Sequence, residues 1–250
     1  TIVKRDRKIS KRKLVVGVPS GITQVEKKAV VDACFQVGIK DVFLIEEPMA
    51  AAIGSDLPIE MPKGNMVVDI GGGTTEVAII SLSATAYSES LRVAGSEIDE
   101  SIIRYLQKKY QVAIGSIAAE KIKIEAASVL PMEDKGDPIS IVGKDMFTGI
   151  PRNIKIPRDE IREAIEEPVS AIIDSVKRAL EKLPPEFVSD LHEAGMVLTG
   201  GGAMLKGLNK RIETETDIRV RVVDDPLFSV VLGSGRAIED MGRYKKVFIN

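Results

Sequence analysis

The chain has 250 residues, of which 44% are hydrophobic and 29% are charged, and its formal net charge is −2. These values are those of an ordinary globular protein, and the small net charge predicts no affinity of the whole molecule for nucleic acid. The single Cys34 excludes a disulfide framework and fits a reducing compartment, and the single His192 argues against a histidine metal site or a Ser-His-Asp triad.

Apolar runs and amphipathic helical periods alternate along the chain, which is typical of an α/β protein. In the first third we expect strands at 13–19 and 41–48, helices at 23–38 and 48–54, and a glycine-rich β-hairpin at 66–83. The middle third predicts helices at 95–110 and 117–130, a β-ribbon at 137–157 and one long helix at 157–183. Strand, turn, helix and strand follow over 195–226, and a last helix lies around 227–240.

Seven basic residues stand close to the N-terminus, against the single acid Asp6: Lys4, Arg5, Arg7, Lys8, Lys11, Arg12 and Lys13. One interpretation is a solvated surface segment. The other is a contact with an anionic membrane or with a partner. The chain also begins at Thr1 without an initiator methionine, so we expect that residues precede it in the protein.

Residues 14–54 and 196–235 share one order of elements and so form an internal repeat. Each unit predicts a strand, a turn of small residues with a hydroxyl, a helix and a second strand. Two acids, a proline and a short apolar helix that ends in glycine then follow in both units. Such a duplication predicts two similar α/β lobes that face each other. Because ligands of α/β sheets lie at the carboxyl ends of strands, we expect a cleft between the lobes.

The stretch "DIGGGTT" holds the first candidate site. Glycines let backbone N–H groups approach an anion, and consecutive N–H groups form a concave nest to which threonine hydroxyls add donors. Asp69 cannot bind phosphate directly because two anions repel each other, so its place requires a cation between them, most simply Mg²⁺ with its water ligands. A glycine-rich hairpin without any ligand is the alternative from this stretch alone.

"VLTGGGAMLKGL" is the second glycine cluster and predicts a strand, a turn and a helix that begins near Ala203. Neither cluster has the GxxxxGK[ST] pattern of a P-loop, and neither fits a Rossmann dinucleotide site well. Two glycine turns in opposite lobes fit a nucleotide held between them, with the phosphates at one turn and the adenosine at the other.

Charged residues at two further places are candidates. Glu46 and Glu47 end a strand and begin a helix, where a glutamate could orient an attacking water or could simply complement the helix N-terminus. Glu120 and Lys123 lie three apart on one helical face, which by itself is typical of a surface pair.

The motifs "GVPSG", "EEPMAAAIG", "DIGGGTTEVA", "AEKIKIE", "LTGGGAMLKGL" and "GSGRAIED", in this order, closely resemble the MreB family of bacterial actin-like rod-shape proteins. The family belongs to the superfamily of actin, sugar kinases and heat-shock ATPases, and the resemblance covers nearly the whole chain. It implies an actin-like (ribonuclease-H-like) α/β fold with duplicated lobes, mixed sheets flanked by helices, and a small α+β insertion.

The resemblance also implies a role for each matching residue. Glu47 falls on the catalytic residue that positions water, and Asp69 on the residue linked to Mg²⁺ through water. The phosphate loop is matched by Gly72, Gly73 and Thr74. The nucleoside is implied to contact Glu120, Lys121, Ile122 and Lys123, and the adenosine motif is matched by Gly200, Gly201, Gly202 and Ala203.

Superfamily members begin with a "D-x-G-T" hairpin, the first phosphate loop, which does not precede residue 1 here. We therefore expect an incomplete first lobe at 1–59 and 229–250, a second lobe at 60–95 and 156–228, and an inserted subdomain at 96–155. We also expect that half of the phosphate cradle is missing.

The function implied is an ATP-switched filament subunit with slow ATPase activity. It would bind ATP or ADP with Mg²⁺ and assemble head to tail with itself. It would work with cell-wall elongation proteins at the inner face of the cytoplasmic membrane, as a cytoplasmic, peripherally membrane-associated protein that maintains rod shape. A sugar-kinase-like phosphotransferase and a chaperone-type ATPase domain are the alternatives, but the chain offers no segment for a sugar pocket and no peptide-binding module after "YKKVFIN".

Overall fold

The computed structural model describes residues 2–5, 12–131 and 136–249, and the strands of these residues form three sheets. We name them the N-terminal sheet (order β1-β2-β3), the central sheet (β11-β10-β4-β5-β6) and the distal sheet (β7-β8-β9). The strands are β1 (Ile2–Arg5), β2 (Arg12–Val18), β3 (Asp41–Glu46), β4 (Asn65–Ile70), β5 (Thr75–Ser81), β6 (Ala84–Leu91), β7 (Val112–Ala113), β8 (Ile139–Asp145), β9 (Pro151–Ile156), β10 (Met196–Thr199) and β11 (Val220–Val222).

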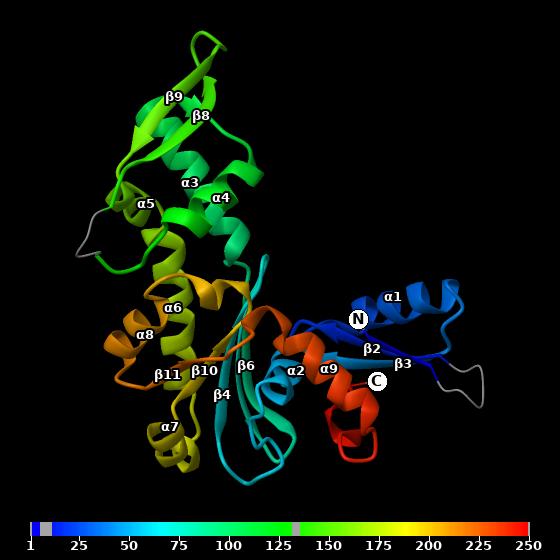
Figure 1. The fold of residues 1–250 in the computed structure, drawn as a ribbon. Coiled ribbons are helices and arrows are strands. Elements are labelled where there is room, and N and C mark those ends of the chain that lie inside the picture. Colours follow the sequence, from blue (N-terminus) through cyan, green and yellow to red (C-terminus); the bar gives the residue numbers. More distant parts are fainter. Residues whose placement is uncertain (1, 6–11, 132–135, 250) are drawn as a thin grey trace.

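Helices cover both faces of the central sheet (Figure 1). The α-helices are α1 (Gln24–Gln36), α2 (Glu47–Gly54), α3 (Gly95–Tyr110), α4 (Ser116–Ala126), α5 (Arg158–Ala164), α6 (Glu166–Glu181), α7 (Val188–Ala194), α8 (Leu208–Thr216) and α9 (Ser229–Glu239). Short 3₁₀ turns are η1 (Pro185–Phe187), η2 (Gly201–Met204), η3 (Pro226–Phe228) and η4 (Lys245–Val247).

Strands β4 and β5 are buried along their whole length, which explains their continuous apolar sequence. Val68 and Ile79 point into the larger core, which also contains the apolar side of α6. Val67 and Ala78 point to the opposite face, into the core that contains α2. Since successive side chains of a strand alternate between faces, a sheet covered on both sides needs apolar residues at every position.

The internal repeat is present as topology. β2 pairs in parallel with β3, and β10 pairs in parallel with β11. Each pair is followed by a short helix, and these two helices, α2 and α9, pack against each other between the N-terminal and central sheets (Figure 1). Their backbones touch at two glycines, because a Cβ on Gly54 would lie 2.7 Å from the carbonyl carbon of Ser229 and one on Gly233 would lie 2.8 Å from the Gly54 nitrogen.

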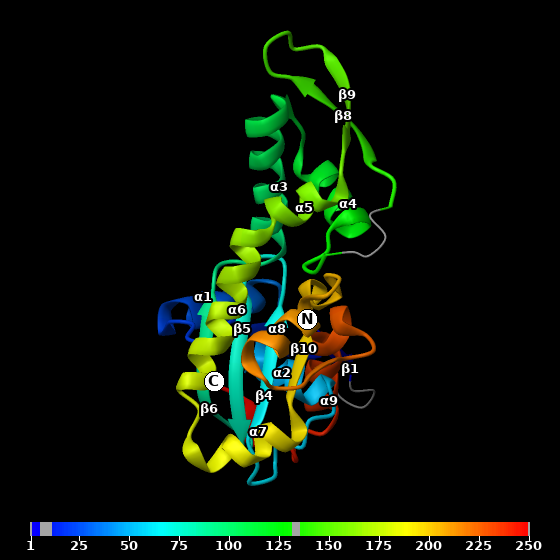
Figure 2. The same ribbon diagram turned by 90° about the vertical axis from the view of Figure 1, so that its left-hand side faces the viewer.

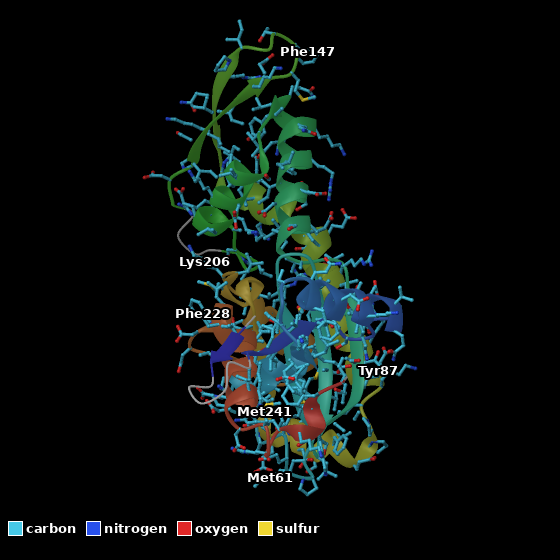
Figure 3. The ribbon with its side chains drawn as sticks, turned by 90° about the vertical axis from the view of Figure 1, so that its right-hand side faces the viewer. Met61, Tyr87, Phe147, Lys206, Phe228 and Met241 are labelled. Atoms are coloured by element: carbon cyan, nitrogen blue, oxygen red, sulfur yellow. The ribbon has the colours of Figure 1, made fainter. Side chains whose placement is uncertain are left out.

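The distal sheet, α3, α4 and α5 stand at one end of the molecule (Figure 2). The predicted β-ribbon is β8 with β9, and its tip carries Phe147, whereas Met61 lies at the opposite end of the molecule (Figure 3). The segment that follows α4 contacts the central part, since Ser128 forms a parallel bridge with Lys206 and the Val129 N–H donates to the Lys206 carbonyl at 2.8 Å.

Two predictions of secondary structure need correction. The single helix expected at 157–183 is broken at Ile165 (φ −94°, ψ 0°), between α5 and α6. Pro168 has no N–H to donate to the carbonyl one turn earlier, so a continuous helix cannot form there. The hairpin expected at 66–83 continues into a third strand, β6, which pairs antiparallel with β5.

In the described ranges, no helix has the length and apolar character that crossing a bilayer requires. The membrane contact that the basic N-terminal residues suggest falls mainly on residues 1–12, whose side chains lie outside the described part. Lys13 is described, and its Nζ lies 3.5 Å from the Met241 sulfur.

Candidate functional site

Asp69 lies near the end of β4, in the middle of the central sheet, where its Cα pairs with Glu76 of β5 and Thr199 of β10. Its side chain is 7% exposed. Among the described residues no hydrogen-bond donor and no cation contacts the Asp69 carboxylate. A buried carboxylate without a partner is costly, so this position is a candidate to bind a cation.

Two further carboxylates, those of Glu47 and Glu76, influence the ionisation of Asp69. Burial, together with the smaller effect of the negative charges of Glu47 and Glu76, raises the pKa of Asp69 to about 7. Burial also raises the pKa of Glu47, with a smaller contribution from Glu76. The pKa of Glu76 is raised by burial as well, although hydrogen bonds from Ser90 and Ser20 act in the opposite direction. A negative charge on one of these carboxylates therefore makes ionisation of the others less favourable. A bound cation would favour the ionised form of all three.

The loop between β4 and β5, residues 71–74, is the first glycine cluster. Its turn is closed by the Gly71 N–H, which donates to the Thr74 carbonyl at 2.9 Å. The carbonyls of Gly71 and Gly72 accept from the first N–H groups of α3, Gly95 at 3.1 Å and Ser96 at 2.7 Å. The loop is thus held against the start of a helix, with its carbonyls occupied.

Apart from Gly71, the N–H groups of the same loop have no acceptor in the described part of the chain. No acceptor among the described residues bonds the N–H of Gly72, Gly73 or Thr74. A Cβ on Gly72 or Gly73 would meet nothing within 4 Å, and neither residue has a positive φ. Neither packing nor backbone conformation therefore requires glycine here. Three consecutive free N–H groups without side chains over two of them form an open set of donors for an anion.

In the second glycine cluster, the fold itself requires glycine at two positions. Gly200 has φ +80°, and a Cβ there would lie 2.5 Å from Oδ1 of Asp69 and 2.6 Å from the carbonyl carbon of Ile70. A Cβ on Gly202 would overlap the Ile70 side chain. Close approach to β4 therefore requires these two glycines, while Gly201 is partly exposed and Ala203 is buried. The cluster lies directly beside the Asp69 carboxylate.

The two neighbouring glutamates, Glu46 and Glu47, differ in their hydrogen bonds. Glu46, the last residue of β3, accepts a hydrogen bond from Oγ1 of Thr85 at 2.9 Å. Glu47, the first residue of α2, has no donor on its carboxylate among the described residues, and its Cγ lies 3.4 Å from the place of a Cβ on Gly17. Of the pair, Glu47 is the one whose carboxylate is available to a ligand or a water molecule.

Of the four predicted residues on α4, Lys123 contacts the start of α3, which holds the glycine loop. Its Nζ donates to the Gly95 carbonyl at 3.0 Å and pairs with Asp99 at 2.9 Å. The Cβ position of Gly95 lies 3.5 Å from Lys123 Nζ and 3.6 Å from the Cα of Gly72. The side chains of Glu120 and Lys121 are exposed, and Ile122 is buried in the larger core.

Sequence reasoning missed Glu76. This residue of β5 is 1% exposed, its Oε2 accepts from the Ser20 N–H at 3.1 Å, and its Oε1 accepts from Oγ of Ser90 at 2.5 Å. The signal was available, because an acid within the apolar run "TEVAII" of a fully buried strand demands polar partners.

A family model described as MreB/Mbl protein matches residues 1–246 of the chain. The cell shape-determining protein MreB of Escherichia coli (strain K12) is 48% identical over 227 residues, which are 91% of this chain and 65% of that protein. The cell shape-determining protein Mbl of Bacillus subtilis (strain 168) is 41% identical over 237 residues, which are 95% of this chain and 71% of that protein. The chain thus spans about two thirds of the length of the curated relatives that it matches.

Solved structures give the same result for the fold. MreB5 of Spiroplasma citri bound to AMPPNP superposes with a TM-score of 0.88 at 32% identity, over 94% of this chain and 70% of that one. The ADP-bound form has the same TM-score, 0.88, and covers 93% of this chain and 71% of that one. The MamK double helical filament, at 22% identity and a TM-score of 0.74 over 90% of this chain and 68% of that one, is similar in fold. The predicted actin-like α/β fold class is confirmed.

Proposed function

Because the chain belongs to the MreB/Mbl protein family, we propose that it is an actin-like cytoskeletal subunit that binds ATP or ADP between two lobes and polymerises. The proposed first lobe comprises residues 1–59 and 229–250, the second lobe 60–95 and 156–228, and the inserted subdomain 96–155. The packing of α2 against α9 supports this division, since it joins the two segments that make up the proposed first lobe.

The free N–H groups of Gly72, Gly73 and Thr74 are the observation that carries the nucleotide site. We assign them to the phosphates, because they are donors without acceptors on a loop whose glycines the chain itself does not require. Lys123, whose ammonium group pairs with Asp99, lies near this loop. The adenosine end is assigned to Gly200, Gly201, Gly202 and Ala203 with the α4 residues Glu120, Lys121, Ile122 and Lys123, and AMPPNP and ADP are bound in the structures of MreB5.

The residues around Asp69 fit Mg²⁺. Its carboxylate is buried, has no donor among the described residues, and faces two more carboxylates. A single carboxylate can hold Mg²⁺ through the water ligands that this ion keeps. When bound, Mg²⁺ would supply positive charge between Asp69 and the phosphates.

Glu47 is the proposed catalytic residue. Burial raises the pKa of its carboxyl, and its oxygens are free of donors among the described residues. A carboxylate in this state can accept a proton from, or hold, a water molecule at the edge of the cleft. In this role Glu47 would support slow ATP hydrolysis. The hydrolysis would time filament assembly and would not serve metabolism.

Head-to-tail self-assembly completes the proposal. A heterologous contact that does not close on itself generates filaments. Relatives are named cell shape-determining proteins, and a protein of the same fold forms a double helical filament. We therefore assign to this protein a cytoplasmic location at the inner face of the membrane, cell-wall elongation proteins as partners, and no role in nucleic-acid binding.

The test of the nucleotide site uses two alanine variants at glycines that tolerate a Cβ. Gly72→Ala lies on the phosphate loop, and Gly242→Ala, whose Cβ would lie 3.6 Å from an Asp240 oxygen, is the matched control. Calorimetric titration with ATP and Mg²⁺ is expected to show at least tenfold weaker binding for Gly72→Ala and unchanged binding for Gly242→Ala. Equal binding by both variants would remove the phosphates from this loop.

Assembly is tested by ultracentrifugation of the protein with ATP, with ADP and without nucleotide. The proposal expects a pelleted fraction that grows with protein concentration and depends on the nucleotide, and that falls in Gly72→Ala together with ATP affinity. A protein that stays monomeric in every nucleotide state contradicts the filament function.

A further inference from the structure

Two hydrogen bonds join the N-terminal sheet to the central sheet on either side of Glu47. On one side, Oγ1 of Thr85 in β6 donates to Oε2 of Glu46 at 2.9 Å. On the other side, the N–H of Ser20, in the loop after β2, donates to Oε2 of Glu76 at 3.1 Å. Both partners on the central sheet come from the antiparallel pair β5–β6, so one rigid element holds two points of the other sheet.

The carboxylate of Glu76 is fixed in place. Its second oxygen, Oε1, accepts from Oγ of Ser90, on the strand next to it. Both donors are neutral, and no cation among the described residues pairs with Glu76, so the negative charge remains uncompensated. A buried acid with both oxygens bound to fixed donors cannot rotate, so it holds the Ser20 loop at a constant position.

Thr85 owes its direction to an irregularity of β6. The pairing of β5 with β6 shifts between Ile79, whose partner is Tyr87, and Ile80, whose partner is Thr85. One extra residue, Ala86, therefore stands in β6, which is a β-bulge. Bulges turn neighbouring side chains out of the regular alternation and are common beside functional sites. Here the residue next to the bulge reaches Glu46.

Both bonds act on the backbone that carries Glu47. Val18 of β2 pairs with Glu46 of β3, directly before Glu47, and Ser20 follows Val18 by two residues. Gly17 of β2 packs against the Glu47 side chain, since a Cβ there would lie 3.4 Å from Glu47 Cγ. Holding Ser20 and Glu46 therefore fixes both strand ends between which Glu47 emerges.

We propose that Thr85 and Glu76 are positioning residues: their bonds to Glu46 and Ser20, here called the Glu47 latch, hold Glu47 at a fixed place opposite Asp69. The latch rests on the proposed function, because Glu47 is the catalytic group of that proposal. A second-lobe movement that breaks these two bonds would release Glu47 and switch hydrolysis off without removing the nucleotide.

The rate of ATP hydrolysis tests whether the Glu47 latch positions Glu47. Thr85→Val keeps the shape of the side chain and removes the donor, and Ser88→Ala on the same strand is the control. At saturating ATP we expect Thr85→Val to release phosphate about tenfold more slowly with ATP affinity within twofold, since small misplacements of a reacting group are costly. In a Glu47→Gln background the same substitution is expected to have no further effect. A tenfold loss that persists in that background, or no loss at all, contradicts the positioning role.

The exchange rate of the Ser20 amide hydrogen tests the Glu47 latch in the absence of nucleotide. Glu76→Ala is expected to speed exchange of the Ser20 amide about fivefold or more, because that N–H loses its acceptor. Glu76→Gln is expected to keep it protected, since its amide oxygen can accept from Ser20 while its NH₂ group donates to Ser90. Glu89→Gln, on β6 and paired with Arg178, is the control. If exchange of the Ser20 amide is unchanged in Glu76→Ala, the latch is wrong. If the variants differ as expected but the wild-type protein binds no ATP, the latch stands and the proposed function is wrong.

Discussion

Asp69→Asn is expected to stabilise the nucleotide-free protein at neutral pH. The aspartate is 7% exposed, and burial with the charges of Glu47 and Glu76 raises its pKa from the ordinary 3.8 to about 7. A carboxyl group whose pKa is higher in the folded than in the unfolded chain favours folding in its protonated form. That advantage is lost as the pH rises from about 4 to 7, because the folded state must then ionise a buried group or keep a proton that the unfolded state has already released.

The size of the effect follows from the two pKa values. The interval between 3.8 and about 7 corresponds to about 4 kcal/mol, at about 1.4 kcal/mol per pKa unit. Asparagine has nearly the same shape and no charge, so Asp69→Asn removes this cost. We expect the variant and the wild type to differ little near pH 4, and the variant to be more stable by up to about 4 kcal/mol above pH 7. Total stabilities of about 5–15 kcal/mol make such a gain easy to measure.

Urea unfolding between pH 4.5 and pH 8, with a metal chelator and without nucleotide, is the assay. Asp174→Asn, at an exposed position of α6, is the control and is expected to show no comparable gain. The same Asp69→Asn protein is expected to lose the Mg²⁺ dependence of ATP binding, so stability and function move in opposite directions. A difference in unfolding free energy that does not grow with pH, or a variant less stable at pH 8, would refute the reasoning.

Two further substitutions test the proposed catalytic residue Glu47 and the packing of α2 against α9. Glu47→Ala is expected to slow phosphate release much more than it weakens ATP binding, and unchanged turnover in a phosphate-release assay removes Glu47 from this role. Gly233→Ala places a Cβ on the Ala50 carbonyl and 2.8 Å from the Gly54 nitrogen. The resulting overpacking, about 2–3 kcal/mol, exceeds the roughly 1 kcal/mol that alanine gains in a helix, so the urea midpoint is expected to fall. A midpoint equal to that of the wild type would show that α2 and α9 can separate freely.

Sequence patterns predicted most elements of the fold because its central strands are buried on both faces. Such strands read as unbroken apolar runs, and β4, β5 and β10 stand out in the chain for this reason. The strand β6 escaped prediction because it lies at the edge of the sheet, half exposed, with serines and a glutamate in its sequence. Its pairing with β5, rather than its own composition, makes it a strand.

Local chemistry also explains the helix that was predicted too long. The acids and bases around 157–183 follow the helix dipole over the whole segment, and the apolar period continues through it. Pro168 was the signal for a break, and the structure interrupts the helix at Ile165, three residues before it. A proline is tolerated in the first turn of a helix, so the segment becomes two helices, α5 and α6.

The roles within the candidate site could be predicted only in part. The sequence identifies Glu46 and Glu47 as a pair, but it contains nothing to tell which of them is free. That distinction depends on Thr85, a residue far along the chain whose direction is set by a bulge. Glu76 was visible as an acid in an apolar strand, yet its partner Ser20 lies in the loop after β2, and only the folded chain brings the two together.

The two glycine clusters look alike as sequence and differ in physical cause. Gly200 and Gly202 are required by the fold itself, because β4 leaves no room for a Cβ at either place. Gly72 and Gly73 are required by nothing within 4 Å, and glycine at an exposed loop costs conformational entropy on folding. Glycines that the fold does not need, and that weaken folding, are best explained by a ligand that binds at this loop. The same holds for Asp69, which has no partner among the described residues and lies in β4 just before this loop, so the proposed ligand with phosphates and a cation would account for both observations.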